Sequence, residues 1–157
     1  MKCEASLIVV KDMEKSRNFY EELLDQKVVM DLGANVSYEG FALHTFESWV
    51  NFIKKDSKEI NLNKTNNAEL YFETEDYDKF LEKFKSFKNI EILNDNHEAP
   101  YGQRLIRFYD LDNHIIEVGE SLESLIIRLS NEGMSISEIT QKTKLPEELV
   151  ITLKNSD

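Results

Sequence analysis

The feature that most constrains this sequence is an internal duplication of its pattern of strands and helices. Each half opens with an apolar strand and an amphipathic helix, and short apolar segments close it. The helix-starting acids Asp12 and Asp76 align at a shift of 64 positions, whereas the last segments align at a shift of 73. The other matched pairs are Tyr20 with Phe84, Val28 with Ile92, Phe41 with His114 and His44 with Glu117. Two βαβββ units are therefore predicted, each with a helix covering one face of its sheet.

Both halves carry the local signals that such a unit needs. Asp12 is suited to an N-cap position, and Glu39-Gly40 is a turn between two strands of a hairpin. In the second half, acidic residues around Asp76 suit a helix start, and 110–113 is a turn before the last strand. The predicted strands are Ser6–Val10, 28–30, 36–38, 41–46, 70–74, 90–93, 105–109 and 115–118.

The composition fits a globular protein and argues against several functional classes. The 157 residues are 41% hydrophobic and 10% aromatic, which is enough for a packed core. No apolar run approaches the roughly 20 residues of a membrane span, so we expect a cytoplasmic protein. The single cysteine, Cys3, excludes an internal disulfide and a thiolate zinc cluster. A net charge of −11 repels phosphate backbones, which argues against nucleic acid as a partner.

Two motifs in the duplicated frame resemble those of a known superfamily. The stretch from Val10 to Tyr20 (VKDMEKSRNFY) resembles the opening of glyoxalase-type proteins. The stretch from Asp110 to Glu117 (DLDNHIIE) resembles their closing Asp-Pro-Asp-Gly…Glu motif, with different residues at its second and fourth positions. This resemblance, over about residues 4–119, is to the vicinal-oxygen-chelate superfamily of glyoxalases, bleomycin resistance proteins and extradiol dioxygenases. It implies an α+β fold in which two βαβββ modules form a cupped mixed sheet around a cavity, often in a homodimer.

The alternation of side chains along each strand predicts which residues face away from the helices. On the strand at 70–74, Leu70 and Phe72 should cover the helix, as should Ile106 and Phe108 on the strand at 105–109. The side chains expected on the opposite, inward face are Glu69, Tyr71, Glu73, Arg107, Tyr109, Ile115 and Glu117.

The resemblance also implies where a metal site would lie. Relatives with a metal take ligands from four equivalent strand positions, which fall here on Ala5, His44, Glu69 and Glu117. Since alanine has no donor atom, at most His44, Glu69 and Glu117 could hold one divalent ion such as Zn, Ni, Mn or Fe. The alternative, which we prefer, is a metal-free pocket with these side chains in a polar network. Paired Glu69 and Glu117 would then repel, and one of them, with a raised pKa, could act as a catalytic acid or base.

Further substrate-binding candidates are Arg107, Tyr71, Tyr109, Trp49 and Tyr101. Arg107 could hold an anionic group of a ligand, or it could form an ion pair with Glu69 or Glu117. Trp49 and Tyr101, expected in or beside loops, could form an aromatic wall or pack at a dimer interface. We expect His97 to be a solvated loop residue and His114, at the start of the last strand, to point out of the cavity.

The last residues, 121–157, extend beyond the superfamily's usual end and should form three short helices. Gly133 is expected to end the first, Ser135 and Glu138 form a capping box for the second, and Pro146 begins the third. This segment has four basic and six acidic side chains, and this excess of negative charge argues against DNA binding. We therefore predict a glyoxalase-like domain at 1–120, with modules at about 4–48 and 68–119, and a helical extension at 121–157 that packs on it.

Three functions remain open from the sequence. One is a lyase or dioxygenase of the glyoxalase-like group with a degenerate metal site, although Ala5 argues against true glyoxalase I activity. Another is a metal-free protein of the bleomycin-resistance kind that binds a drug or metabolite. The third is a regulatory module that uses the C-terminal helices.

Overall fold

The structure, a computed structural model, describes residues 1–156 and shows two sheets with the same strand order. The first half contains β1 Ser6–Val10, α1 Met13–Asn18, the π-helix η1 Phe19–Leu23, β2 Met30–Asp31, β3 Asn35–Ser37, β4 Phe41–Thr45, α2 Phe46–Ile53 and the 3-10 helix η2 Ser57–Glu59. The second contains β5 Glu69–Thr74, α3 Tyr77–Ser86, β6 Ile92–Glu98, β7 Arg104–Tyr109 and β8 Ile115–Glu120. Three helices follow: α4 Leu122–Asn131, α5 Ile136–Thr143 and α6 Glu147–Lys154.

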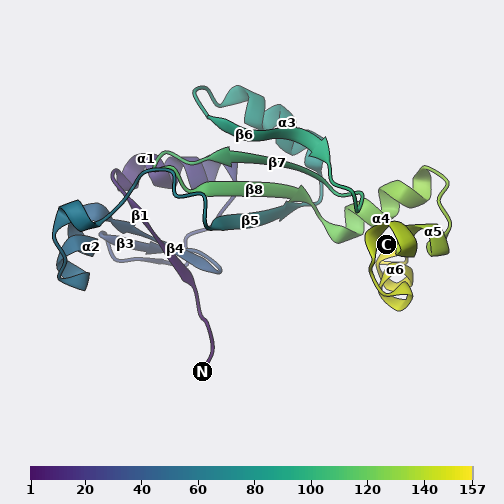
Figure 1. The fold of residues 1–157 in the computed structure, drawn as a ribbon, viewed down its shortest axis with the longest axis horizontal. Coiled ribbons are helices and arrows are strands. Elements are labelled where there is room, and N and C mark those ends of the chain that lie inside the picture. The colour runs from purple at the N-terminus through teal and green to yellow at the C-terminus, as the bar shows by residue number, and fades with distance from the viewer. Residues whose placement is uncertain (157) are drawn as a thin grey trace. The chain divides into compact units, whose positions relative to one another are not determined.

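The strand orders are β1-β4-β3-β2 and β5-β8-β7-β6, so the predicted duplication is confirmed (Figure 1). In the first sheet β1 runs parallel to β4, which is antiparallel to β3. The hairpin turns at Glu39-Gly40 as expected, and Gly40 has a φ of +85°, a conformation that glycine adopts without steric cost. By their contacts the residues form two compact units, one of 1–70, 89–91 and 109–115 and the other of 71–88, 92–108 and 116–156.

Side chains on the helices close the apolar faces of the sheets. In the first unit, Asp12 caps α1 by accepting a hydrogen bond from the backbone of Lys15, and Tyr20 and Leu23 are fully buried. In the second unit, the Phe84 ring of α3 packs against Phe108 of β7 with a centroid distance of 4.8 Å. This contact confirms that Phe108 faces the helix, as the alternation predicts.

Three parts of the sequence prediction were wrong. The strand expected at 28–30 is only Met30–Asp31, and the strand expected at 90–93 is Ile92–Glu98, an exposed polar strand at the edge of its sheet. Because all its residues are exposed, that strand has no apolar alternation to reveal it. Consequently His97 lies in β6 and not in a loop, although it is exposed as expected. Trp49 lies in α2, where helix was not predicted at all.

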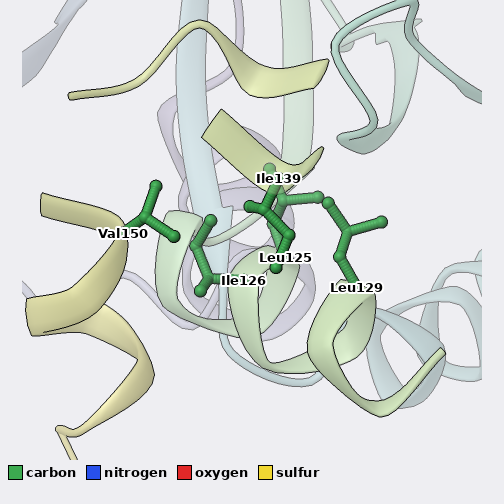
Figure 2. Packing of buried hydrophobic residues seen from close by; sticks show 5 residues of the cluster. All are labelled: Leu125, Ile126, Leu129, Ile139 and Val150. Atoms are coloured by element: carbon green, nitrogen blue, oxygen red, sulfur yellow. The ribbon is translucent and has the colours of Figure 1, made fainter. Parts of the chain in front are cut away.

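The C-terminal helices have a small core of their own. Gly133 has a φ of +92° after α4, the capping box of Ser135 and Glu138 is present, and Pro146 directly precedes α6, all as expected. Figure 2 shows the cluster of five buried aliphatic side chains from the three helices, which are Leu125, Ile126, Leu129, Ile139 and Val150. None of the helices within residues 1–156 is long and apolar enough to cross a membrane.

Candidate functional site

A cavity of about 210 Å³ lies in the first compact unit. Three segments line it: residues 6–8 of β1, residues between 61 and 70, and the turn at 112–115 that leads into β8. Its lining includes two carboxylates, Glu69 and Asp112, together with Ser, Thr, Asn and His side chains, and no lysine or arginine is among the described lining residues. The lining thus combines apolar side chains, such as Leu7, Ile8 and Ile115, with polar and acidic ones.

Asp110 fixes the turn that forms one wall of this cavity. Its Oδ1 accepts hydrogen bonds from the backbone nitrogens of Asp112 (2.9 Å) and His114 (2.8 Å). Its Oδ2 accepts from the hydroxyl of Tyr20 (2.7 Å) and lies 2.8 Å from Nδ1 of His114. Burial, followed by the Asp110 charge, raises the pKa of Tyr20 well above its ordinary value, so this phenol remains a donor. Asp110 thus stabilises the turn, and Asp112 is held in place by it.

Asp112 is the buried acid of the cavity, with only 3% of its surface exposed. Its Oδ2 accepts a hydrogen bond from the backbone nitrogen of Lys11 (3.1 Å). Its buried Oδ1 lies 3.8 Å from Lys11 Nζ, too far for a hydrogen bond, and accepts none from residues 1–156. Burial raises the pKa of Asp112, since the backbone bond and the Lys11 charge compensate only in part.

The opposite wall, between residues 61 and 70, is held by side chains from the closing turn. The Tyr109 hydroxyl donates to Oδ1 of Asn66 (2.6 Å), and the Asn113 amide donates to the carbonyl of Leu62 (2.8 Å). Lys64 lies over the Tyr109 ring, 4.6 Å from its centroid, and pairs with Glu91. Tyr109, predicted to bind substrate, contacts the segment that lines the cavity.

His44, a predicted metal ligand, is buried within a network of the first unit. Ser37 Oγ donates a hydrogen bond to Oδ1 of Asn35. The other end of this amide, the Asn35 side-chain nitrogen, lies 3.2 Å from Nδ1 of His44. Nδ1 is then an acceptor, and the proton on Nε2 is donated to Ser48 Oγ at 3.0 Å. Burial lowers the pKa of His44, which favours this neutral form. The Trp49 ring packs edge-on against the imidazole, with 5.7 Å between the ring centroids, so Trp49 covers His44.

In the second unit, the inward-facing residues form a separate polar group. Glu117 is buried and forms an ion pair with Arg107, one of the two alternatives that the sequence left open. The Tyr71 hydroxyl donates to Glu73 (2.8 Å) and accepts from the Gln103 amide (2.8 Å). Burial followed by the Glu73 bond raises the pKa of Tyr71, and the Glu117 charge adds to this rise. Tyr101 lies in a turn and is 41% exposed.

The predicted site residues are thus distributed over both units. Glu69 lines the cavity, whereas His44, Trp49 and Tyr109 belong to its unit without lining it. Glu117, Arg107, Tyr71 and Tyr101 belong to the second unit. Sequence reasoning assigned no site role to Asp112, which was read as part of the turn and of the closing motif. The prediction that His114 points out of the cavity was wrong, because His114 is among the lining residues. His114 precedes β8, is half-buried and lines the cavity. The two aspartates in Asp110-Leu-Asp112 were the sequence feature that could have predicted an acidic site here.

The side chains at the superfamily's metal-ligand positions do not fit a metal ion here. Ala5 has no donor atom, both ring nitrogens of His44 are hydrogen-bonded, and Glu117 is paired with Arg107. Within residues 1–156, no three His, Cys, Asp or Glu side chains form a group suited to a metal ion. The chemistry open to these residues is hydrogen bonding, ion pairing and proton transfer.

Comparison with known proteins places the chain in a family. A model of the glyoxalase-like domain matches residues 3–123. The fosfomycin resistance protein FosX of Listeria innocua is 27% identical over 114 residues, which are 71% of this chain and 83% of that protein.

Solved structures agree with this assignment. A protein of unknown function from Agrobacterium tumefaciens is 35% identical, with a TM-score of 0.70 over 78% of this chain and 95% of its own. A glyoxalase/bleomycin resistance protein/dioxygenase family enzyme from Burkholderia phytofirmans has the same fold at 10% identity, with a TM-score of 0.65 over 78% of this chain and all of its own. The chain therefore belongs to the glyoxalase-like domain family of the vicinal-oxygen-chelate superfamily.

Proposed function

We propose that this protein binds a small polar molecule in the cavity between β1, residues 61–70 and the 112–115 turn, without the help of a metal ion. The observation that carries the proposal is the cavity itself, a hollow of about 210 Å³ with a mixed apolar and polar lining and walls held by Tyr109, Asn113 and Asp110. Concave sites with a few well-positioned polar groups are the usual binding sites for small molecules.

The protein's own residues would recognise the ligand by hydrogen bonds and charge. Glu69 and Asp112 supply acceptors, and His114 is fixed by Asp110 beside them. A lyase or dioxygenase activity would require ligands that His44 and Glu117 do not offer, since each is engaged with neighbouring side chains. Binding of a drug or metabolite, as in bleomycin resistance proteins, is therefore the better supported function.

The FosX relatives raise fosfomycin as a ligand for this chain. Fosfomycin carries an anionic phosphonate, whereas the cavity lining contains two carboxylates and, within the described residues, no lysine or arginine. Like charges at close range disfavour binding. We expect no protection against fosfomycin when the protein is expressed in a susceptible strain, a result that growth assays would measure directly.

A cavity-filling variant tests the proposed site. Ala68 lines the cavity, whereas its neighbour Asn67 does not. We expect Ala68→Phe to abolish ligand binding, as measured by titration calorimetry with hits from a metabolite panel, and Asn67→Phe to retain it. Elemental analysis of protein purified without chelator should find less than one metal ion per ten chains. Equal binding by both variants, or stoichiometric metal that is needed for binding, would overturn the proposal.

A further inference from the structure

We infer that residues 61–68 form a strap that opens locally, without unfolding of its compact unit, and so lets molecules enter and leave the cavity. The inference rests on the proposed function in taking this cavity as the binding site, whereas the opening itself is a property of the chain. The two sides of the cavity are held in very different ways.

One side of the cavity is fixed by regular structure and by a buried carboxylate. Residues 6–8 belong to β1, which pairs with β4 along its whole length. In the turn at 112–115, Asp110 Oδ1 accepts hydrogen bonds from two backbone nitrogens. Ile115, which begins β8, lines the cavity and yet is only 8% exposed. Movement of this side would break the sheet or the turn.

The other side, the strap, has almost no structure of its own. Four of its eight residues are asparagine, and Leu62 alone is partly buried. Within residues 1–156, no backbone–backbone hydrogen bond involves residues 61–68. None of the residues from 46 to 69 is buried, so no core side chain anchors the strap on its N-terminal side. Segments with so few buried contacts and backbone hydrogen bonds open at a low cost in free energy.

Hydrogen bonds and ion pairs join the strap to the rest of its unit at three places within residues 1–156. The Tyr109 hydroxyl donates to Oδ1 of Asn66 (2.6 Å), and the Asn113 amide donates to the carbonyl of Leu62 (2.8 Å). Lys64 lies over the Tyr109 ring and forms an exposed ion pair. Exposed ion pairs contribute little to stability, so the two hydrogen bonds are the main anchors of the strap.

The strap is also a wall of the cavity, and this makes it an entrance. The lining residues that it supplies are Asn61, Leu62, Asn63, Thr65, Asn66 and Ala68. When it lifts, the inner side chains of the fixed side become accessible while β1 and the turn stay in place. This opening breaks two hydrogen bonds and uncovers little apolar surface, whereas unfolding of the unit would expose a whole packed sheet.

The reaction of an introduced thiol measures this opening. Ile115→Cys places a thiol on the fixed side of the cavity, in a chain whose own exposed cysteine is removed by Cys3→Ser. In the same background, Leu43→Cys places a thiol in β4, at a fully buried position that reacts only when the unit unfolds. The rate of reaction with dithionitrobenzoate is followed by absorbance for both.

Tyr109→Phe loosens the strap, because it removes the hydroxyl that binds Asn66 and keeps the ring beneath Lys64. Tyr38→Phe is the matched control. The Tyr38 hydroxyl also donates to a side chain of the same unit, that of Glu21 at 3.1 Å, but outside the strap and the cavity lining.

A second pair of variants tests the other anchor. Asn113→Gly removes the side chain that binds the Leu62 carbonyl, and glycine readily adopts the φ of +70° found at this position. Asn89→Gly is its control, since Asn89 is exposed, has a φ of +65° and lies outside the cavity lining.

We expect the thiol of Ile115→Cys to react about tenfold or more faster than that of Leu43→Cys, because local opening is easier than unfolding. Tyr109→Phe and Asn113→Gly should each accelerate the reaction of Ile115→Cys about fivefold, the factor that corresponds to one lost hydrogen bond. Tyr38→Phe should accelerate the reaction of Leu43→Cys but leave that of Ile115→Cys within about twofold, because the open strap leaves the Tyr38 bond intact. Asn89→Gly should likewise leave the Ile115→Cys rate within about twofold.

Two results would overturn the strap. If Tyr38→Phe accelerates the reaction of Ile115→Cys as strongly as that of Leu43→Cys, the cavity opens only when the whole unit unfolds. If neither Tyr109→Phe nor Asn113→Gly changes the Ile115→Cys rate, molecules reach the cavity by another route. No ligand takes part in these measurements, so the proposed function fails separately, when no molecule of the metabolite panel binds.

Discussion

At the residue scale, Asp110 and Asp112 lie two positions apart and have opposite environments. Asp110 accepts bonds from two backbone nitrogens, a tyrosine and a histidine, so its charge is well compensated. Asp112 is equally buried but has one backbone donor and a distant lysine. The first aspartate therefore stabilises the fold, whereas the burial of the second carries a cost that its few partners offset only in part.

Asp112→Asn should accordingly stabilise the free protein at neutral pH. Because the folded-state pKa of Asp112 is raised, its stabilising contribution is present below the unfolded value and is lost as pH rises through the folded value. Lys11, Asp110 and His114 are the charged or titratable groups that face it. We expect a gain of about 1 kcal/mol at pH 7 that shrinks toward pH 4, measured by urea unfolding. A loss of stability at pH 7 would contradict this account.

His44 should make the folded protein sensitive to mild acid. Its pKa is lowered by burial, so its contribution to stability is present above the ordinary value of 6.5 and is lost as pH falls below it. We expect the melting temperature to fall between pH 7 and pH 5, and His44→Gln to reduce that fall. His97→Gln, which changes an exposed histidine, should leave the wild-type pH profile intact.

At the scale of elements, one buried carboxylate connects the helical tail to the second sheet. Glu120, at the end of β8, is 1% exposed and pairs with Arg104 of β7 (3.2 Å) and with Arg128 of α4 (2.9 Å). Burial alone would raise the pKa of Glu120, but the hydrogen bonds and charges of the two arginines lower it. Arg128 also donates to the carbonyl of Gly102 (2.7 Å). This network fastens α4 to the strands.

Arg128→Met should therefore cost about 2 to 3 kcal/mol of stability, because it leaves Glu120 buried with one partner fewer. Glu132 also pairs with Arg128 but is exposed, so Glu132→Gln should cost well under 1 kcal/mol. Chemical unfolding of both variants measures the difference. If both substitutions lower the free energy of unfolding by the same amount, the buried ion pair stabilises the protein no more than the exposed one.

The elements that the sequence predicted well are those with strong local signals. The capping acids Asp12 and Asp76, the glycine turn at Gly40 and the capping box at Ser135 all lie where their chemistry requires. One strand was predicted too short and one helix was missed. In β6 only Ile92 and Leu93 are apolar, so the exposed polar part up to Glu98 shows no apolar alternation. In α2 the apolar side chains Phe46, Trp49, Val50 and Ile53 do have helical spacing, a signal that could have predicted the helix.

The site was harder to predict than the fold, because its key contacts join residues far apart in sequence. Alternation on two strands made the ion pair between Arg107 and Glu117 one of the alternatives left open. By contrast, the contacts of Tyr109 with Asn66 and of Lys11 with Asp112 span 43 and 101 positions. These contacts depend on the path of irregular segments between the strands, and the spacing of apolar residues does not predict that path. Asp112 was therefore read only as part of a turn and of the closing motif, without a role in a site.

At the scale of the whole molecule, the helices α4–α6 belong to the same compact unit as α3 and most of the second sheet. Their division from a domain at 1–120 stays a prediction from the sequence. Deletion of 121–157 would remove the Arg128 partner of buried Glu120 together with the packed aliphatic cluster. We expect the shortened chain to melt at a lower temperature and to lose hydrogen-exchange protection first in β7 and β8. An unchanged melting temperature would instead show that residues 121–157 do not stabilise the rest of the protein.

Homodimer formation, expected from the superfamily, is also a property of the whole molecule. The strand β2 is the edge of the first sheet, and Val29, Met30 and Leu32 around it are 70%, 54% and 68% exposed. Exposed apolar edges of this kind favour association. Light scattering should give about twice the chain mass of 18.4 kDa, and Leu32→Glu should shift the protein toward monomer. Leu149→Glu, on the exposed face of α6, serves as the control.

The identical strand order of the two sheets has a consequence for how this protein can change over evolutionary time. Each half has its own hairpin before its last strand, with Glu39 exposed in one and Asp112 buried in the other. The two turns therefore differ in how freely they can change. Substitutions at exposed Glu39 should be tolerated, whereas substitutions at buried Asp110 or Asp112 would disturb the compact unit that both turns belong to.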